Sequence, residues 1–146
     1  MNRQKNNLMT KDKLKADLHK AGYRATPARL AILKVLSQAK KPLNIRQIMD
    51  RLEGSKIDQT TVYRNINYLK DSGLILHIDF QHTHAFYELA SKGDHHHVVC
   101  TKCDRVEDVN NCDLDKMTVK ALNQSNFASI SNHSLEFFGV CRPCQK

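Results

Sequence analysis

HHHVVCTKC, at residues 95–103, is the stretch around which the C-terminal half of this chain is organised. It ends in a Cys-x-x-Cys pair, Cys100 and Cys103, and a second pair, Cys141 and Cys144, closes the chain. Two such pairs supply the four thiolates of a tetrahedral structural zinc site. We therefore predict that one Zn(II) ion ties the end of the chain to its middle. The alternative is a redox switch at one of the two pairs.

The segment between the two pairs, residues 104–140, is longer than a small zinc ribbon needs. We expect strands over residues 95–99, 105–109 and 134–139, and a helix over residues 114–123. The chain has five cysteines, so Cys112 is left over once the four ligands are assigned. The odd count also disfavours a closed disulfide framework.

The three histidines before the first pair predict a second kind of metal site. Because side chains alternate along a strand, His95 and His97 share one face, and Asp94 and His96 share the other. Mixed histidine and carboxylate ligands bind Zn(II), Fe(II) or Mn(II) more reversibly than four thiolates do. The candidates that complete the first site are His77, Glu88 and Asp108, and those that complete the second are Asp115 and His133.

The positive charge of the chain lies upstream of these metal motifs. Residues 1–90 contain 16 Lys and Arg against 8 Asp and Glu, whereas residues 91–146 contain seven of each. A basic half beside a neutral half indicates one part for a polyanion and another part for a different task.

The basic half has the element order of a winged helix. Helices are predicted over residues 11–21, from Thr26-Pro27 to about Ser37, from Asn44 to Gly54, and from Asp58 to Ser72, because a capping residue begins each of the last three. Strands follow at residues 74–78 and 84–89. We expect residues 1–10 to be disordered and residues 90–94 to form a hinge.

The predicted fourth helix is the candidate DNA reader. In helix-turn-helix proteins the second helix of the motif enters the major groove, where arginine pairs with guanine and an aromatic ring packs on a thymine methyl. Its candidate DNA-contacting residues are Thr60, Thr61, Tyr63, Arg64 and Asn67.

Other classes of protein are disfavoured. No apolar stretch approaches the roughly 20 residues of a membrane span. The N-terminus lacks the apolar region of a secretory signal, so a cytoplasmic location is expected. An enzyme that uses His95, His97 and a carboxylate is the distant alternative. The chain has no HExxH-like motif, and we expect a protein that is not an enzyme.

Several of these motifs occur together in one known family. They are GYRATPAR at 22–29, TVYR at 61–64, His-x-His before the first Cys-x-x-Cys, NHSL at 132–135, and the closing pair. From about residue 12 to residue 144 the chain resembles the ferric uptake regulator (Fur) family. The resemblance implies an α+β protein, with a winged-helix DNA-binding domain at residues 1–89 and an α/β dimerisation domain at residues 95–146. It also implies a homodimer that represses metal-uptake genes from a palindromic AT-rich operator.

The resemblance implies roles for individual residues. Tyr63 and Arg64 look like the base-contacting pair, and Arg24 looks like a basic residue that enters an AT-rich minor groove. Matched in the same way, the structural zinc ligands are Cys100, Cys103, Cys141 and Cys144. The regulatory metal ligands are Glu88, His95 and His97, with Asp108. The ligands of an additional site are His96, Asp115 and His133, with a contribution from Asp94.

The sensed metal is a separate question. Iron- and peroxide-sensing members usually supply a histidine from the DNA-binding domain, and the matching position, near Pro42, has none. Zinc-sensing members use a histidine just after the recognition helix, where His77 stands. We therefore expect Zn(II) to be favoured as co-repressor, with iron, manganese or peroxide sensing as the alternatives.

Overall fold

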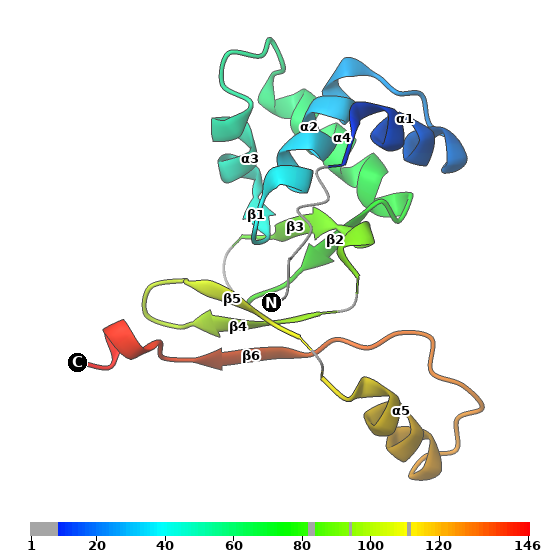
Figure 1. Cartoon of the computed structure of the whole chain (residues 1–146), viewed down its shortest axis with the longest axis vertical. Helices are drawn as coiled ribbons and strands as arrows, with labels where there is room; N and C mark the ends of the chain where they lie inside the picture. The colour runs from blue at the N-terminus through cyan, green and yellow to red at the C-terminus, as the bar shows by residue number, and fades with distance from the viewer. Residues whose placement is uncertain (1–8, 82–83, 94, 111) are drawn as a thin grey trace, which may run out of the picture. The chain divides into compact units, whose positions relative to one another are not determined.

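The computed structural model describes residues 9–81, 84–93, 95–110 and 112–146 (Figure 1). The chain consists of two compact units, Met1–Lys92 and Gly93–Lys146. The predicted disorder falls mainly on residues 1–8, outside the described part, and the same is true of the candidate ligand Asp94. No helix in the described part is long and apolar enough to cross a membrane.

The first unit is built on helices α1 (Lys11–Lys20), α2 (Pro27–Gln38), α3 (Ile45–Arg51) and α4 (Gln59–Asp71). Each begins where the sequence places a capping side chain, which accepts a hydrogen bond from a backbone N–H of the first turn. The capping box of α3 is complete, because Asn44 Oδ1 accepts from the backbone of Gln47 at 2.8 Å and Gln47 Oε1 accepts from that of Asn44 at 3.0 Å. The caps fix where each helix starts.

One face of every helix in this unit contributes to a common core. The apolar side chains recur at helical spacing, so that α4 buries Val62, Ile66 and Leu69, and Asn65 is buried beside them. Burial of these faces is the main favourable term in folding the unit. The buried helical residues include Leu14, Leu18, Ile32, Leu33, Leu36, Ile48, Val62, Ile66 and Leu69.

The first unit also has a three-stranded antiparallel sheet, whose first strand precedes α3 and whose other two strands follow α4. Its strands are β1 (Leu43–Asn44), β2 (Ile75–Ile78) and β3 (Phe86–Leu89), in the order β1-β3-β2. Gly73, with φ of 73°, provides the left-handed exit from α4 into β2. A helix-turn-helix followed by this hairpin is a winged helix, as predicted. A short 3₁₀ helix, Ala90–Lys92, occupies part of the predicted hinge.

The second unit is an α/β unit with strands β4 (His96–Cys100), β5 (Val106–Val109) and β6 (Glu136–Gly139), and helix α5 (Leu114–Asn123). The sheet order is β5-β4-β6, with β5 antiparallel and β6 parallel to β4. Parallel strands end at the same edge of a sheet, so the Cys-x-x-Cys pairs at the ends of β4 and β6 meet there. A 3₁₀ helix, Arg142–Cys144, forms the second pair.

Candidate metal centre

Four cysteine sulfur atoms converge at the end of the β4–β6 pair. The Sγ atoms of Cys100, Cys103, Cys141 and Cys144 all lie within 4.8 Å of one another, and those of Cys103 and Cys141 are 3.7 Å apart. A tetrahedral Zn–S shell with bonds of about 2.3 Å separates its sulfur atoms by about 3.8 Å. The residues present therefore fit a four-thiolate zinc ion.

Backbone geometry shapes the two cysteine turns. In the first, Asp104 adopts φ of 59° and donates its N–H to the carbonyl of Cys100 at 3.0 Å, while Cys100 donates to the carbonyl of Arg105 at 2.9 Å. Aspartate is among the residues that tolerate this left-handed conformation. In the second turn, Cys144 donates to the carbonyl of Cys141 at 2.9 Å. Each turn brings its two sulfur atoms to one side.

The four thiols differ in acidity. The backbone N–H of Cys141 donates to Cys100 Sγ over 3.3 Å and lowers the pKa of the Cys100 thiol to about 6. In contrast, the neighbouring sulfur atoms of Cys141 and Cys103 raise the pKa of Cys144 to about 12. Adjacent thiolates disfavour one another, so full ionisation of the set requires a compensating cation. This electrostatic demand is what a divalent ion satisfies.

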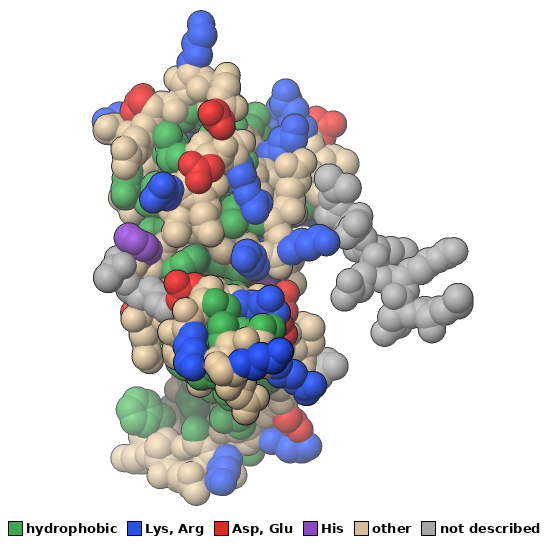
Figure 2. Space-filling view, turned by 90° about the vertical axis from the view of Figure 1, so that its left-hand side faces the viewer, with side chains coloured by type: hydrophobic (Ala, Val, Ile, Leu, Met, Phe, Trp, Pro, Cys, Tyr) green, Lys and Arg blue, Asp and Glu red, His purple; other side chains and the backbone are tan. Residues whose placement is uncertain are grey.

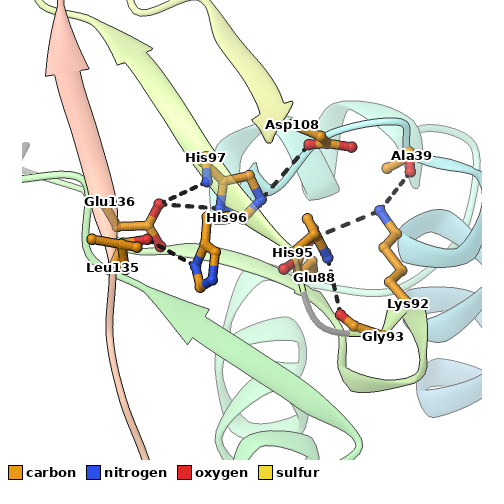
Figure 3. A network of polar contacts seen from close by, with 10 residues as sticks. All are labelled: Ala39, Glu88, Lys92, Gly93, His95, His96, His97, Asp108, Leu135 and Glu136. Atoms are coloured by element: carbon orange, nitrogen blue, oxygen red, sulfur yellow. Dashed lines mark hydrogen bonds and ion pairs between the residues drawn. The ribbon is translucent and has the colours of Figure 1, made fainter. Parts of the chain in front are cut away.

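The three consecutive histidines of the second unit share one hydrogen-bonding pattern (Figure 3). Nδ1 of His95 lies 3.0 Å from the carbonyl oxygen of Gly93, and Nδ1 of His96 lies 3.0 Å from that of Leu135. Nδ1 of His97 lies 3.2 Å from a carboxylate oxygen of Glu136. An oxygen acceptor at Nδ1 places the proton there and leaves Nε2 as the ligand atom. All three rings are therefore arranged to bind metal through Nε2.

His95 and His97 lie on one face, as strand alternation predicts. Their ring centroids are 4.8 Å apart. Asp108 is paired with His97 in the β4–β5 register, and its carboxylate lies 3.8 Å from His97 Nε2. The structure therefore brings together three of the predicted regulatory ligands within the second unit.

The opposite face carries the candidate residues of the additional site. The rings of His96 and His133 are 5.4 Å apart, and His96 Nε2 is buried without a hydrogen-bond partner among the described residues. Asp115 lies in the first turn of α5. Within the described residues it does not join these two histidines in a group whose ligand atoms all lie within 4.8 Å. The two histidines are brought together, and the aspartate is not.

The strand register does not support the prediction that His77 and Glu88 bind the same metal ion. In the β2–β3 register His77 pairs with Tyr87, and Leu76 pairs with Glu88. Paired residues share a face and adjacent residues alternate, so His77 and Glu88 point to opposite sides of the hairpin. One ion therefore cannot bind both while this register holds. Glu88 lies 4.0 Å from Lys92 Nζ, a cation that belongs to the same unit.

The predicted DNA-reading residues lie on the outer face of α4. Tyr63 is 47% exposed, which for so large a ring indicates an open surface rather than a core position. Thr60, Arg64 and Asn67 are also exposed, and Thr61 is half-buried. Thr61 is held by Asp58, which accepts from its backbone N–H at 2.9 Å and from its hydroxyl at 2.8 Å. These two bonds lower the pKa of the Asp58 carboxyl.

Arg24 is exposed on the loop between α1 and α2, and Arg29 holds that loop. Arg29 Nη1 donates to the carbonyl oxygen of Arg24 at 2.8 Å. Its guanidinium lies 5.4 Å from the ring centroid of Tyr23 and 5.6 Å from that of Tyr68, in cation–π contact with both. Since Tyr68 belongs to α4, Arg29 connects the Arg24 loop to the candidate reading helix.

Two residues that make these contacts, Arg29 and Glu136, were not predicted from the sequence. Arg29 occurs in the GYRATPAR motif, but its contact with Tyr68 joins segments that are far apart along the chain. Glu136 had no local signal either, because only the parallel register of β4 and β6 places it beside His97. The only signal in the sequence was that Glu136 is a carboxylate at the start of a predicted strand.

Known proteins resemble the chain over most of its length. It matches the model of the ferric uptake regulator family over residues 20–138. It is 33% identical over 134 residues to the "Ferric uptake regulation protein" of Neisseria meningitidis serogroup A, covering 89% of this chain and 92% of the relative. It is 30% identical over 131 residues to the "Peroxide operon regulator" of Bacillus subtilis, covering 88% and 89%.

Solved structures agree with this result. The ferric uptake regulator of Vibrio cholerae superposes with a TM-score of 0.74 at 29% identity, covering 87% of this chain and 98% of that one. The similarity covers both the winged helix and the unit that holds the cysteines. The chain therefore belongs to the ferric uptake regulator family of metal-responsive transcriptional regulators.

Proposed function

We propose that this protein is a repressor that binds operator DNA when a divalent metal, with Zn(II) preferred, occupies the histidine site. The observation that carries the proposal is that the rings of His95 and His97 lie side by side, with their centroids 4.8 Å apart. Both rings engage Nδ1 with an oxygen acceptor, which directs Nε2 toward a metal. Two imidazoles oriented in this way form half of a four-ligand site.

The remaining ligands in this proposal are carboxylates. Asp108 faces His97 within the second unit. Glu88, also a candidate ligand from the sequence, belongs to the unit that carries the winged helix. An ion bound by ligands of both units would favour particular arrangements of the two. A ligand that shifts such an equilibrium from mostly inactive to mostly active must prefer the active state by about 5 kcal/mol.

The preference for Zn(II) rests on donor chemistry. A site with two imidazoles binds Zn(II) more tightly than Fe(II) or Mn(II) in the usual order of divalent metals. The relatives do not choose among metals, because regulators named for iron uptake and for peroxide match at similar identity. The absence of a histidine near Pro42 supports zinc over iron and peroxide.

DNA recognition is assigned to α4 and to the loop that carries Arg24. Tyr63 and Arg64 lie on the exposed face of the helix and are proposed to read bases in the major groove. Thr60, Thr61 and Asn67 are proposed to contact phosphates or base edges nearby. Arg24 is proposed to enter the minor groove, where A·T-rich sequence attracts basic side chains.

A second copy of the chain is the proposed partner of the second unit. Helix α5 has no buried residue, and its apolar side chains Met117 and Val119 are 55% and 56% exposed. Exposed apolar side chains (green) are visible over this unit in the lower part of Figure 2. Phe137, Phe138 and Val140 are exposed as well. A homodimer would cover this surface and place two recognition helices roughly 34 Å apart on a palindromic operator.

The additional metal site is also a proposal. His96 and His133 are proposed as its first two ligands, because a buried ring nitrogen without a hydrogen bond is costly unless something binds it. Asp115, and Asp94 outside the described residues, would complete it.

The test is a DNA-binding titration with Zn(II), Mn(II) and anaerobic Fe(II) at buffered free-ion concentrations. The proposal predicts operator binding that needs metal and is half-saturated at the lowest free concentration with Zn(II). In the same titration His95→Ala/His97→Ala should lose the response to metal. His19→Ala is the matched control for this variant, because His19 is an exposed histidine of α1. Equal operator binding with and without chelator would refute the metal requirement. Release of DNA by peroxide, with no response to chelation, would instead support the redox alternative.

A further inference from the structure

We propose that Glu136 is the positioning residue for the metal ligand His97: its carboxylate fixes the imidazole so that Nε2, and not Nδ1, binds the regulatory metal. The proposal rests on the function proposed above, in which His97 is a ligand. It adds a residue of β6 to a site whose ligands were assigned elsewhere.

Two contacts join Glu136 to His97 (Figure 3). One carboxylate oxygen, Oε2, lies 3.2 Å from Nδ1 of the ring and 3.2 Å from the backbone nitrogen of the same residue. A carboxylate only accepts, so both nitrogens donate to it. Holding the backbone and the ring with one atom restricts rotation of the side chain. The His97 side chain is itself buried, which restricts it further.

Glu136 is placed to orient the ring rather than to bind the same ion. Asp108 lies 3.8 Å from Nε2, and Glu136 lies beside Nδ1. The two nitrogens of an imidazole point in divergent directions, so an ion on Nε2 lies on the far edge of the ring from Glu136. A histidine that binds metal usually donates its other ring N–H to an oxygen acceptor, often a carboxylate. This hydrogen bond increases the basicity of the coordinating nitrogen.

The sheet supplies this contact through register. His97 pairs with Glu136 and Cys100 pairs with Gly139 along the same two parallel strands. The end of β6 therefore carries a zinc-binding cysteine turn, and its start carries the group that orients His97. His95 and His96 use backbone carbonyls for the same purpose, whereas His97 uses a side chain. Substitution can therefore test this contact selectively.

The experiment uses the full-length protein with its four-cysteine site filled. Zn(II) affinity of the histidine site is measured by competition with a chromophoric chelator for wild type, Glu136→Ala and Glu136→Gln. Glu107→Gln is the matched control, because Glu107 lies on the same sheet with its side chain 65% exposed. We expect Glu136→Ala to bind roughly 10- to 100-fold more weakly, Glu136→Gln to lie between it and wild type, and the control to match wild type.

A second readout follows the ring itself. Long-range ¹H–¹⁵N spectra of zinc-loaded wild type should show His97 with a protonated Nδ1 and a metal-bound Nε2. Metal on Nδ1 in wild type would overturn the proposal, and so would wild-type affinity in Glu136→Ala. Zinc content of the four-cysteine site reports folding. If Glu136→Ala loses that zinc, Glu136→Gln and the wild-type spectrum decide the matter.

The two proposals fail separately. If wild-type operator binding is independent of metal while His97 shows the predicted ring state, the proposed function falls and the role of Glu136 stands. If operator binding needs metal but Glu136→Ala and Glu136→Gln bind zinc like the control, the role of Glu136 falls and the function stands.

Discussion

Arg29 and Arg24 are linked by a 2.8 Å hydrogen bond from the guanidinium of the first to the carbonyl oxygen of the second. The same guanidinium is in cation–π contact with the rings of Tyr23 and Tyr68. A planar fork that stacks and donates at once is a property of arginine that lysine lacks. The link therefore positions a proposed minor-groove residue relative to the proposed reading helix.

Arg29→Lys should weaken operator binding although it preserves charge. Loss of one hydrogen bond and the stacking amounts to about 1–2 kcal/mol, or roughly tenfold in Kd. Fluorescence anisotropy with labelled operator measures the change, with Arg51→Lys, an exposed arginine of α3, as the matched control. Equal affinity of the two variants would mean that the Arg24 loop does not depend on Arg29.

Arg64→Ala should relax base preference as well as lower affinity. A bidentate arginine–guanine pair contributes about 1–3 kcal/mol of discrimination, so the variant should accept substitutions at one operator position. Lys70→Ala, which removes an exposed lysine in the last turn of the same helix, is the charge-matched control, because loss of a charge that attracts phosphates weakens all sequences alike. Binding measured across single-base operator variants separates the two. Unchanged selectivity in Arg64→Ala would contradict base reading by this residue.

Removing the four-cysteine metal should loosen β6. Cys103→Ser should lose the zinc bound by the cysteines, whereas Cys112→Ser should keep it, since Cys112 lies outside the cluster. The amide of Thr101, which donates to the carbonyl of Gly139 at 2.8 Å, should then exchange at least about tenfold faster. Zinc content and hydrogen exchange measured on both variants test this. Retained protection in zinc-free protein would show that the sheet does not depend on the ion.

Asp58 predicts a pH dependence with a defined sign. Its pKa is lowered in the folded chain, chiefly by the backbone N–H of Thr61. A depressed carboxyl pKa stabilises the fold above the unfolded-state pKa, and this contribution is lost as pH falls through the folded-state value. The difference in free energy of unfolding between wild type and Asp58→Ala should therefore be largest near neutral pH and should decrease below about pH 4. Urea unfolding at several pH values measures it, with Asp50→Ala as control. A difference that is constant with pH would contradict the linkage.

Much of the fold follows from local signals. Three helix starts were predicted from capping residues, and the structure has helices at all three positions. The residues are Thr26 with Pro27, Asn44 with Gln47, and Asp58. The cysteine quartet follows from spacing alone. These features were predictable because each depends on residues that are neighbours in sequence.

Long-range register was not predictable in the same way. The two-residue strand β1 exists only because it pairs with β3. The parallel β4–β6 pair spans an entire strand and helix between its partners, and it alone brings Glu136 to His97. The opposite facing of His77 and Glu88 likewise depends on which residues pair across the hairpin. A single sequence contains no direct record of such pairings.

The most direct test of metal control is the operator affinity of His95→Ala/His97→Ala at saturating free Zn(II). We predict that this variant keeps its four-cysteine zinc and its fold but binds operator as weakly as chelator-treated wild type. Wild-type affinity in the double variant, whose histidine site cannot fill, would show that metal at this site does not control DNA binding.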